Sequence, residues 1–304
     1  MAMNRTQFKK ELQLGLNSVF GLEYRQHAEK WRKYLTVETE GKKAYVEDVM
    51  LAGFGAAPTK AEGAGVAYQS TSEIYTARYV FETIALAFAI TEEAEEDNLY
   101  GSVGARLSRA LSRAMQHTKA VRGANILNNG FSASFLGGDG VALFSTAHLG
   151  EGSQVSNMLA TAADLSETSL EDILTMIADM QDYRGIPIAL QAMKLVIATA
   201  NRFTAQRILF SDLQADSAEH NINAIKDLGI LQGGSVVMDE RLTDPDAWFV
   251  TTNCPDGLKH IVRKTVSKGI EGDFESGNMR YKARERYING WSDWHGAVGT
   301  AGGG

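Results

Sequence analysis

Two consecutive segments of this chain are longer than the elements of an ordinary globular domain. Residues 74–90 alternate in a pattern typical of one extended strand, and residues 91–128 carry the pattern of a helix. At the rise of a strand and of a helix, each segment spans up to about 55 Å. A compact chain of this length has a diameter of only about 50 Å. We therefore expect an elongated subunit whose exposed flanks are covered by neighbouring copies.

Acidic residues open the predicted helix. Thr91 is placed to cap it, and the first turn contains Glu92, Glu93, Glu95 and Glu96. Acids at this position complement the positive end of the helix dipole. Carboxylates for catalysis or cation binding are the alternative interpretation, but dipole matching explains the cluster with fewer assumptions.

The composition narrows the chemistry that the chain can perform. Hydrophobic residues make up 44% of the 304 residues, and no apolar run is long enough to span a membrane. The single cysteine, Cys254, excludes an intramolecular disulfide and suits a reducing cytoplasm. Scattered histidines and the lack of a cysteine cluster or nucleophile motif argue against a metal site, a cofactor site and catalysis. The sequence therefore contains no motif that identifies an enzyme.

Charge is segregated along the chain, although the net charge is only −7. Residues 1–36 contain seven bases and three acids, residues 129–258 six bases and seventeen acids, and residues 259–286 eight bases and four acids. A basic arm, an acidic middle and a basic end are consistent with head-to-tail complementarity between copies. Plain solubility explains the same pattern equally well, so both interpretations stay open.

The first 73 residues contain two segments without an evident core of their own. Residues 4–35 have helical periodicity and form either a basic arm, which grips a neighbour, nucleic acid or a scaffold, or a surface helix on their own domain. Residues 41–73 are rich in turn residues and predict a long two-stranded hairpin. Such a hairpin has too little apolar mass to be stable alone. A partner subunit is its natural support, and a glycine-rich active-site lid at 51–65 is the rival interpretation.

The second half of the chain predicts an α/β region followed by a β-rich tail. The elements expected in the α/β region are a helix opened by a capping box at 168–171, a short helix at 201–210, and strands at 195–199, 235–239 and 248–252. In the tail, one face carries four bases, which are Arg280, Lys282, Arg284 and Arg286. A nucleic-acid surface would have aromatic residues on the same face, whereas the tyrosines here point to the opposite one. We expect this basic face to pair with an acidic surface of a neighbour, either the acidic middle or the glutamates at 92–96.

The order of these parts resembles the tailed-bacteriophage major capsid proteins, and its phrasing is nearest to the Mu-like major head subunit family. The residues that carry the resemblance are 91–100 at the start of the helix, 143–148 after it, and 290–293 near the end. The resemblance covers nearly the whole chain and rests on the order of the parts, since no single motif is diagnostic. It implies an α+β Hong Kong-97-type capsid fold.

The resemblance also implies a division of the chain into named parts. These are an N-terminal arm at 1–40, an extended hairpin loop at 41–73, a peripheral domain with a spine helix at 74–164, an axial domain at 165–245, and a return to the peripheral domain at 246–304. Lys60 lies near the tip of the predicted loop and is a candidate inter-subunit contact.

The function implied is that of a major head protein, which assembles into pentamers and hexamers of an icosahedral shell around double-stranded DNA. Its expected partners are other copies of itself, a separate scaffold protein, portal and decoration proteins, and packaged DNA contacted without sequence specificity. It would reside in the virion after assembly in the host cytoplasm. Two alternatives are an encapsulin-like nanocompartment shell and a cytoplasmic α/β enzyme with a glycine-rich lid.

Overall fold

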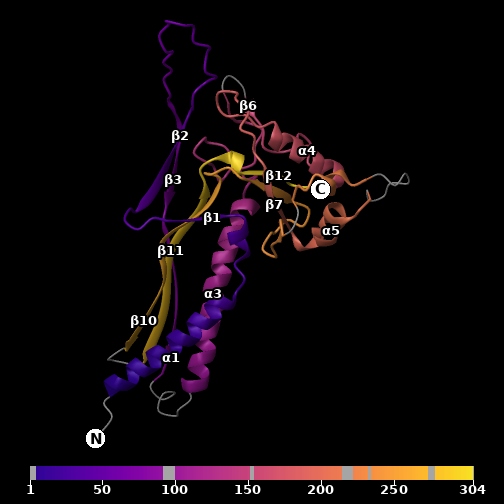
Figure 1. Ribbon diagram of the computed structural model, residues 1–304. Coiled ribbons are helices and arrows are strands. Elements are labelled where there is room, and N and C mark those ends of the chain that lie inside the picture. Colours follow the sequence, from indigo (N-terminus) through magenta and orange to yellow (C-terminus); the bar gives the residue numbers. More distant parts are fainter. Residues whose placement is uncertain are drawn as a thin grey trace.

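The computed structural model describes residues 5–91, 100–150, 154–213, 222–231, 234–272 and 278–303. Figure 1 shows a long body of strands and helices, a more rounded lobe set at an angle to it, and a thin loop that projects beyond both. The N-terminal end lies at the far tip of the long body, and the C-terminal end lies in the lobe. The subunit is elongated, as the lengths of its elements predict.

A four-stranded sheet forms the long body. The strand order is β1–β10–β11–β4, in which β1 is parallel to β10 and the other neighbours are antiparallel. These strands are β1 (Thr36–Thr39), β10 (Leu258–Gly272), β11 (Met279–Trp291) and β4 (Glu82–Ile90). β10 has 15 residues and β11 has 13, so each extends for roughly 45 Å.

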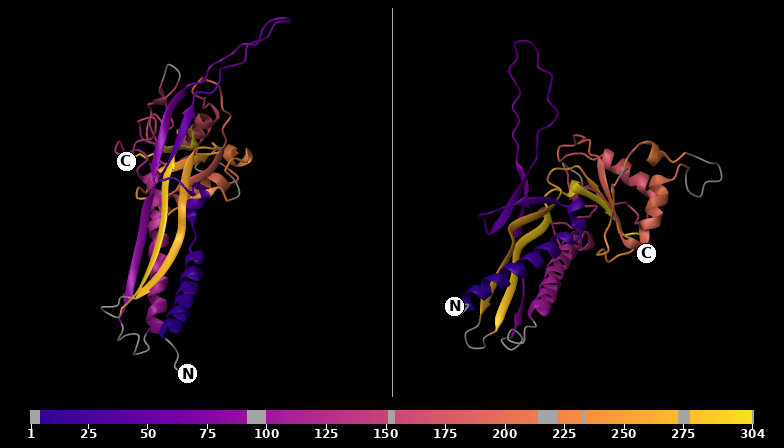
Figure 2. Two further views of the ribbon diagram at one scale, coloured as in Figure 1. Left: turned by 90° about the vertical axis from the view of Figure 1, so that its left-hand side faces the viewer. Right: turned by 60° about the horizontal axis from the view of Figure 1, so that its bottom comes forward.

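Two helices cover one face of this sheet. α1 (Arg5–Gln26) lies beside α3 (Tyr100–Asn128) on the same side of the strands (Figure 2). Their shared core includes Phe20, Met115 and Tyr281, none of which is more than 1% exposed. Burial of large side chains at this interface fixes both helices on the sheet.

α3 is the long helix that the sequence predicts. It has 29 residues and is about 43 Å long. Gly101 and Gly104 lie inside it without ending it. The predicted beginning of the helix at 92–99 lies outside the described residues.

The strand predicted at 74–90 is two strands, so that prediction is wrong in this respect. β3 (Glu73–Val80) pairs with β2 (Tyr45–Leu51), whereas β4 pairs with β11. The chain changes sheets at Phe81, whose side chain is 6% exposed. The buried positions change from odd-numbered residues in β3 to even-numbered residues in β4, but no turn residue marks the break, and both halves are extended. β2 and β3 form the stem of the predicted hairpin, and residues 52–72 form its loop.

A second four-stranded sheet builds the lobe, in the order β12–β9–β7–β8. Its strands are β12 (Ala297–Thr300), β9 (Trp248–Thr252), β7 (Ala192–Ile197) and β8 (Val236–Met238). The helices of the lobe are α4 (Glu167–Ala178), α5 (Arg202–Phe210) and α6 (Ala224–Asp227). Leu170, Ile173 and Trp248 are fully buried between these layers. The α/β pattern expected for this region is present, with boundaries shifted by a few residues.

The capping box of α4 lies two residues before the predicted one. Ser166 is the N-cap and accepts a hydrogen bond from the Ser169 backbone N–H, while the Ser169 hydroxyl accepts one from the Ser166 N–H. A serine at the third helical position therefore replaces the glutamate that the motif usually carries. The remaining short elements are β5 (His148–Leu149), β6 (Gln154–Val155) and 3-10 turns at Lys30–Lys33, Thr199–Asn201 and Trp294–Gly296.

Candidate assembly surfaces

The extended loop at 52–72 has almost no support from its own chain. It projects from the stem formed by β2 and β3, away from both sheets (Figures 1 and 2). Phe54, Val66 and Tyr68 are 60%, 67% and 96% exposed. The two arms are tied by a hydrogen bond of 2.9 Å from the Gly55 N–H to the side-chain oxygen of Gln69. Exposed aromatic and aliphatic side chains on such a loop indicate a contact surface for another molecule.

The stem of this loop is held firmly against the large sheet. The Tyr75 hydroxyl donates to the Ser292 carbonyl at 3.1 Å, and the Tyr79 hydroxyl donates to the Trp291 carbonyl. Burial raises the pKa of both phenols, so they remain neutral donors. The Tyr79 ring can pack here only because residue 290 is glycine, since a Cβ at Gly290 would lie 2.3 Å from the ring.

A buried lysine also joins the stem to the sheet. Nζ of Lys259 lies 3.0 Å from Asp48 of β2, 2.8 Å from Asp256 and 3.4 Å from Glu38 of β1. Burial alone would lower the pKa of Lys259, but hydrogen bonds to Asp256 and Asp48 outweigh it and raise the pKa. The stem therefore has a fixed base, while its loop is free to reach outward.

α1 is attached to its own subunit by polar contacts as well as by its apolar face. The hydroxyls of Ser108 and Ser112 on α3 donate to carbonyls of α1 at 3.1 and 3.3 Å. Lys119 of α3 forms an ion pair of 2.7 Å with Glu285 of β11, and Tyr24 of α1 donates to the same carboxylate at 3.0 Å. Burial and the nearby Glu285 raise the pKa of Tyr24. Of the two interpretations of the N-terminal segment, packing on its own domain describes α1.

The basic face predicted in the tail is present on β11. Arg280, Lys282 and Arg284 are exposed on the face of the sheet that no helix covers, and Arg286 is half-buried there. The alternating positions from Met279 to Tyr287 are buried toward the helices. Beside the bases, β4 contributes the exposed residues Thr83, Ala85, Ala87 and Ala89. The structure therefore places the four predicted bases on one face of β11.

The acids expected to pair with this face are not placed by the structure. Glu92, Glu93, Glu95 and Glu96 lie outside the described residues. Lys60 is exposed within the loop at 52–72, which projects away from both four-stranded sheets. Among the described candidates, the structure brings the four bases together on one strand and places Lys60 on a separate segment.

Two histidines that are far apart in the sequence come together near Trp294, in the turn that joins β11 of the large sheet to β12 of the lobe. The rings of His148 and His295 both stack on Trp294, at centroid distances of 4.5 and 3.6 Å. His148 is 2.6 Å from Asp139, and His295 is 2.5 Å from Asp293. Burial would raise the pKa of Asp293, but its contacts with His295 lower it. No local motif signals this cluster, because its members come from loops more than a hundred residues apart.

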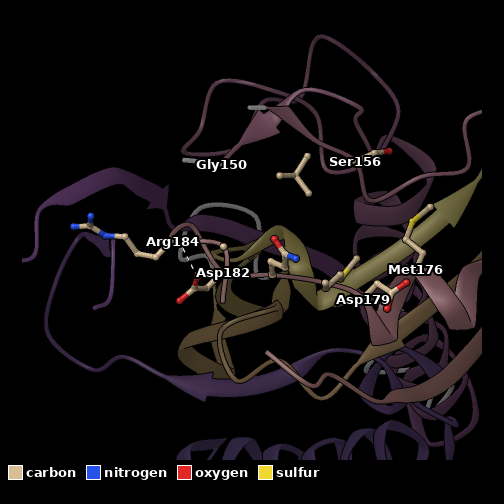
Figure 3. Close-up of a pocket in the computed structure, with 10 residues that line it drawn as sticks. Gly150, Ser156, Met176, Asp179, Asp182 and Arg184 are labelled. Atoms are coloured by element: carbon tan, nitrogen blue, oxygen red, sulfur yellow. Dashed lines mark hydrogen bonds between the residues drawn. The ribbon is translucent and has the colours of Figure 1, made fainter. Parts of the chain in front are cut away.

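A cavity beside α4 bears on the alternative of an enzyme. This cavity of about 350 Å³ lies between the segment around β6 and the end of α4 with the turn after it, lined by Met176, Asp179, Asp182 and Arg184 among others (Figure 3). The Asp182 carboxylate accepts hydrogen bonds from the backbone N–H groups of Arg184 and Ile186 at 2.8 and 2.9 Å, so it stabilises a turn. Within the described ranges, no group of three or more metal-binding side chains exists. None of the helices described there has the length and apolarity to cross a membrane.

The sequence profile of the phage capsid protein family matches residues 74–299, which is most of the chain. The chain belongs to the phage capsid protein family. The match begins in β3 and ends in β12, so it includes α3 and every strand of the two four-stranded sheets except β1. No curated protein gives a detectable match to the sequence.

Solved capsids share the fold of this capsid protein at low sequence identity. The virus-like particle of Pyrococcus furiosus is 11% identical with a TM-score of 0.57, and the match covers 94% of this chain and 97% of that one. For the capsid of cyanophage P-SCSP1u the values are 12%, 0.57, 88% and 86%. For the procapsid of bacteriophage JBD30 they are 15%, 0.54, 97% and 75%. The Hong Kong-97-type fold expected from the sequence is confirmed, and the Mu-like subfamily stays a prediction.

The family match also shows the broad role of the chain. It is a capsid protein, a structural component of the phage particle. In this role the exposed loop, the uncovered basic face and the fixed stem are expected parts of one subunit, because a shell is built from contacts between copies.

Proposed function

We propose that this capsid protein assembles into the pentamers and hexamers of an icosahedral shell around double-stranded DNA. The observation that carries the proposal is the loop at 52–72, whose side chains at Phe54, Val66 and Tyr68 have no cover in their own subunit. A neighbouring copy would bury them and so make the loop a strap between subunits. The protein acts mechanically and catalyses no reaction.

Charge complementarity sets the register of neighbouring subunits in this proposal. The bases on β11 would meet an acidic surface of the next copy, with the glutamates at 92–96 or the acidic middle of the chain as candidates. Lys60 would contribute a further contact from the loop. The parts of the shell subunit would follow the division into arm, extended loop, peripheral domain and axial domain.

The other partners follow from the same role. A separate scaffold protein, a portal, decoration proteins and packaged DNA would contact the shell, and assembly would take place in the host cytoplasm before the protein resides in the virion. An encapsulin-like compartment is the second candidate, because a virus-like particle shares the fold. The family match to phage capsid proteins favours the phage shell.

Negative-stain electron microscopy of the purified protein tests the proposal. We expect shells, tubes or separate capsomers for the parent sequence. A variant with Phe54→Ser and Tyr68→Ser should keep its fold, as judged by circular dichroism, and lose these particles. The variant Thr59→Ser is a matched control in the same exposed loop. A parent protein that remains a uniform small monomer would contradict the proposal, and shells that enclose a protein cargo instead of DNA would favour the compartment.

A further inference from the structure

β4 is an edge strand without the usual protection of an edge. It has β11 on one side and no strand on the other in the described sheet. Residues 83–90 carry no charge. Leu86 is 48% exposed, and the small residues Ala85, Ala87 and Ala89 are exposed as well. Soluble proteins normally block such an edge with charges, proline or a bulge, because its free N–H and C=O groups can pair with another chain. An uncharged flat edge of this length is therefore a candidate interface.

α3 runs alongside β4 in the opposite direction. At one end Arg122 of α3 forms an ion pair with Glu82, and at the other end the Ile90 side chain lies 3.4 Å from the Cβ position of Gly104. The helix between these points is about 27 Å long, and the strand between them is about 26 Å long. The two elements therefore stay in register over the whole edge.

The flank of α3 beside this edge is uncharged as well. Val103, Leu107, Ala110, Ala114 and Val121 fall within about 60° of one another at 3.6 residues per turn. All five are exposed or half-buried. They face away from α1, which occupies the opposite flank through the Ser108 and Ser112 contacts. α1 lies toward β10, where Lys268 donates to the Asn17 carbonyl, so the uncharged flank faces the free edge of β4.

A hollow lies next to the Glu82 end of β4, on the side of the sheet that α3 covers. It has a volume of about 640 Å³ and lies where the chain leaves the large sheet, between α3 and the end of β11. Val121, Phe135, Ile288 and Trp291 are among its lining residues. Glu82 and Arg122 also line it, and their opposite charges form an ion pair with each other. The strand edge, the helix flank and the hollow together form one surface without net charge.

We propose that this surface is a two-fold interface, in which β4 pairs antiparallel with β4 of a second copy about Ala87. In that register Leu86 lies opposite Phe88, Ala85 opposite Ala89 and Ile84 opposite Ile90. Every small residue on the uncovered face meets a small residue, and every large one on the helix side meets a large one. A two-fold contact needs a self-complementary patch, and residues 84–90 provide one. The inference rests on the proposed shell function and names one of its contacts.

The dimensions of the molecule permit this contact. α3 contacts both β4 and β11, so two such helices around the axis would lie about 10 Å apart, which is the distance of packed helices. The small side chains of Ala110 and Ala114 suit that approach. The two columns of bases on β11 would be separated by three strand spacings, or about 14 Å, which exceeds the screening length of about 8 Å at physiological salt. Repulsion between them would therefore be weak.

Disulfide trapping in assembled particles tests the register. The parent for the test is Cys254→Ser, which removes the only natural thiol and leaves a hydroxyl to donate to Asp293. Across the axis, Cα atoms of paired residues are about 4.5 to 5.5 Å apart, within the range that a disulfide bridges. Ala87→Cys should therefore give a dimer on non-reducing gels after mild oxidation, and dithiothreitol should reverse it.

Ala85→Cys and Ala89→Cys are matched controls on the same exposed face. Each lies about 13 Å along the strand from its own symmetry mate, so each alone should give about tenfold less dimer than Ala87→Cys. The double variant with both cysteines should cross-link again. Shells by electron microscopy without an Ala87→Cys dimer, or with dimers from the single controls instead, would overturn this interface and leave the shell function standing. A cross-link to a different protein would overturn it too. Absence of any particles in the Cys254→Ser parent and the natural sequence would instead contradict the shell function.

Discussion

The two faces of β11 differ in whether helices of the same subunit cover their charged side chains. On the helix side, Glu285 is 1% exposed and is held by Lys119 and Tyr24 from two different helices. On the other side, the neighbouring residue Arg284 is exposed, and no helix of the subunit covers it. One strand therefore separates charges that stabilise the folded subunit from charges that are available to a neighbour. Substitutions on the two faces should affect different measurements.

The largest effect on folding should come from Glu285→Ala. The change leaves Lys119 buried without its partner, which typically costs about 3–5 kcal/mol. Urea unfolding of unassembled subunits measures the loss. Arg284→Ala, one residue away on the other face, should change the free energy of unfolding by less than about 0.5 kcal/mol. Equal effects of the two substitutions would break the comparison.

The pH dependence of the free energy of unfolding tests the side of the large sheet that the helices cover. His260 is 1% exposed and packs between Trp31 and Tyr287, and burial lowers its pKa to about 4 from an ordinary value of 6.5. Because the folded state disfavours the charged imidazole, this group does not reduce the free energy of unfolding above pH 6.5. The free energy of unfolding then falls as the pH falls toward 4. We expect the free energy of unfolding to fall by about 2–3 kcal/mol over this window from this group.

The control for the titration is His260→Phe, which fills similar volume without a titrating group. Its free energy of unfolding should fall less steeply between pH 6.5 and 4 than that of the natural protein. The comparison uses the slopes, since the substitution also removes the contact between His260 and Asn289. Parallel slopes in the two proteins would show that the helix side does not hold this imidazole neutral.

A smaller effect on folding is expected where the loop stem packs against the end of β11. Gly290→Ala would place a Cβ 2.3 Å from the Tyr79 ring, and such overpacking costs about 1–3 kcal/mol. Because Tyr79 anchors the stem, limited proteolysis at 52–72 should also become faster. Gly65→Ala is the matched control, since nothing lies within 4 Å of a Cβ there. Unchanged stability and proteolysis in Gly290→Ala would mean that the stem is not fixed by this contact.

The two-sided character of β11 was predictable because it is local. A strand has a side-chain period of two, so the buried and basic faces from Met279 to Tyr287 can be assigned from sequence alone. The length of α3 and the strand at Trp248–Thr252 follow from similar local patterns.

What the sequence could not predict depends on contacts between distant residues. The Lys119–Glu285 pair joins residues far apart in the chain, and nothing near either one marks its partner. The change of sheet at Phe81 is marked by no turn residue, although it decides that β4 has a free edge. The stacking of His148 and His295 on Trp294 has the same origin.

The smallest effect on folding, and a large one on assembly, is expected for Arg284→Glu. The side chain is exposed, so the free energy of unfolding should change by less than about 0.5 kcal/mol. A negative charge among Arg280, Lys282 and Arg286 would face the acidic surface proposed on the neighbour, and like charges brought together cost several kcal/mol at an interface. We therefore expect folded subunits and few particles by negative-stain electron microscopy. Arg284→Lys keeps the charge and should assemble as the natural protein does. Normal particles from Arg284→Glu would show that the uncovered face of β11 takes no part in the charge pairing, and would leave the loop at 52–72 as the main contact between copies.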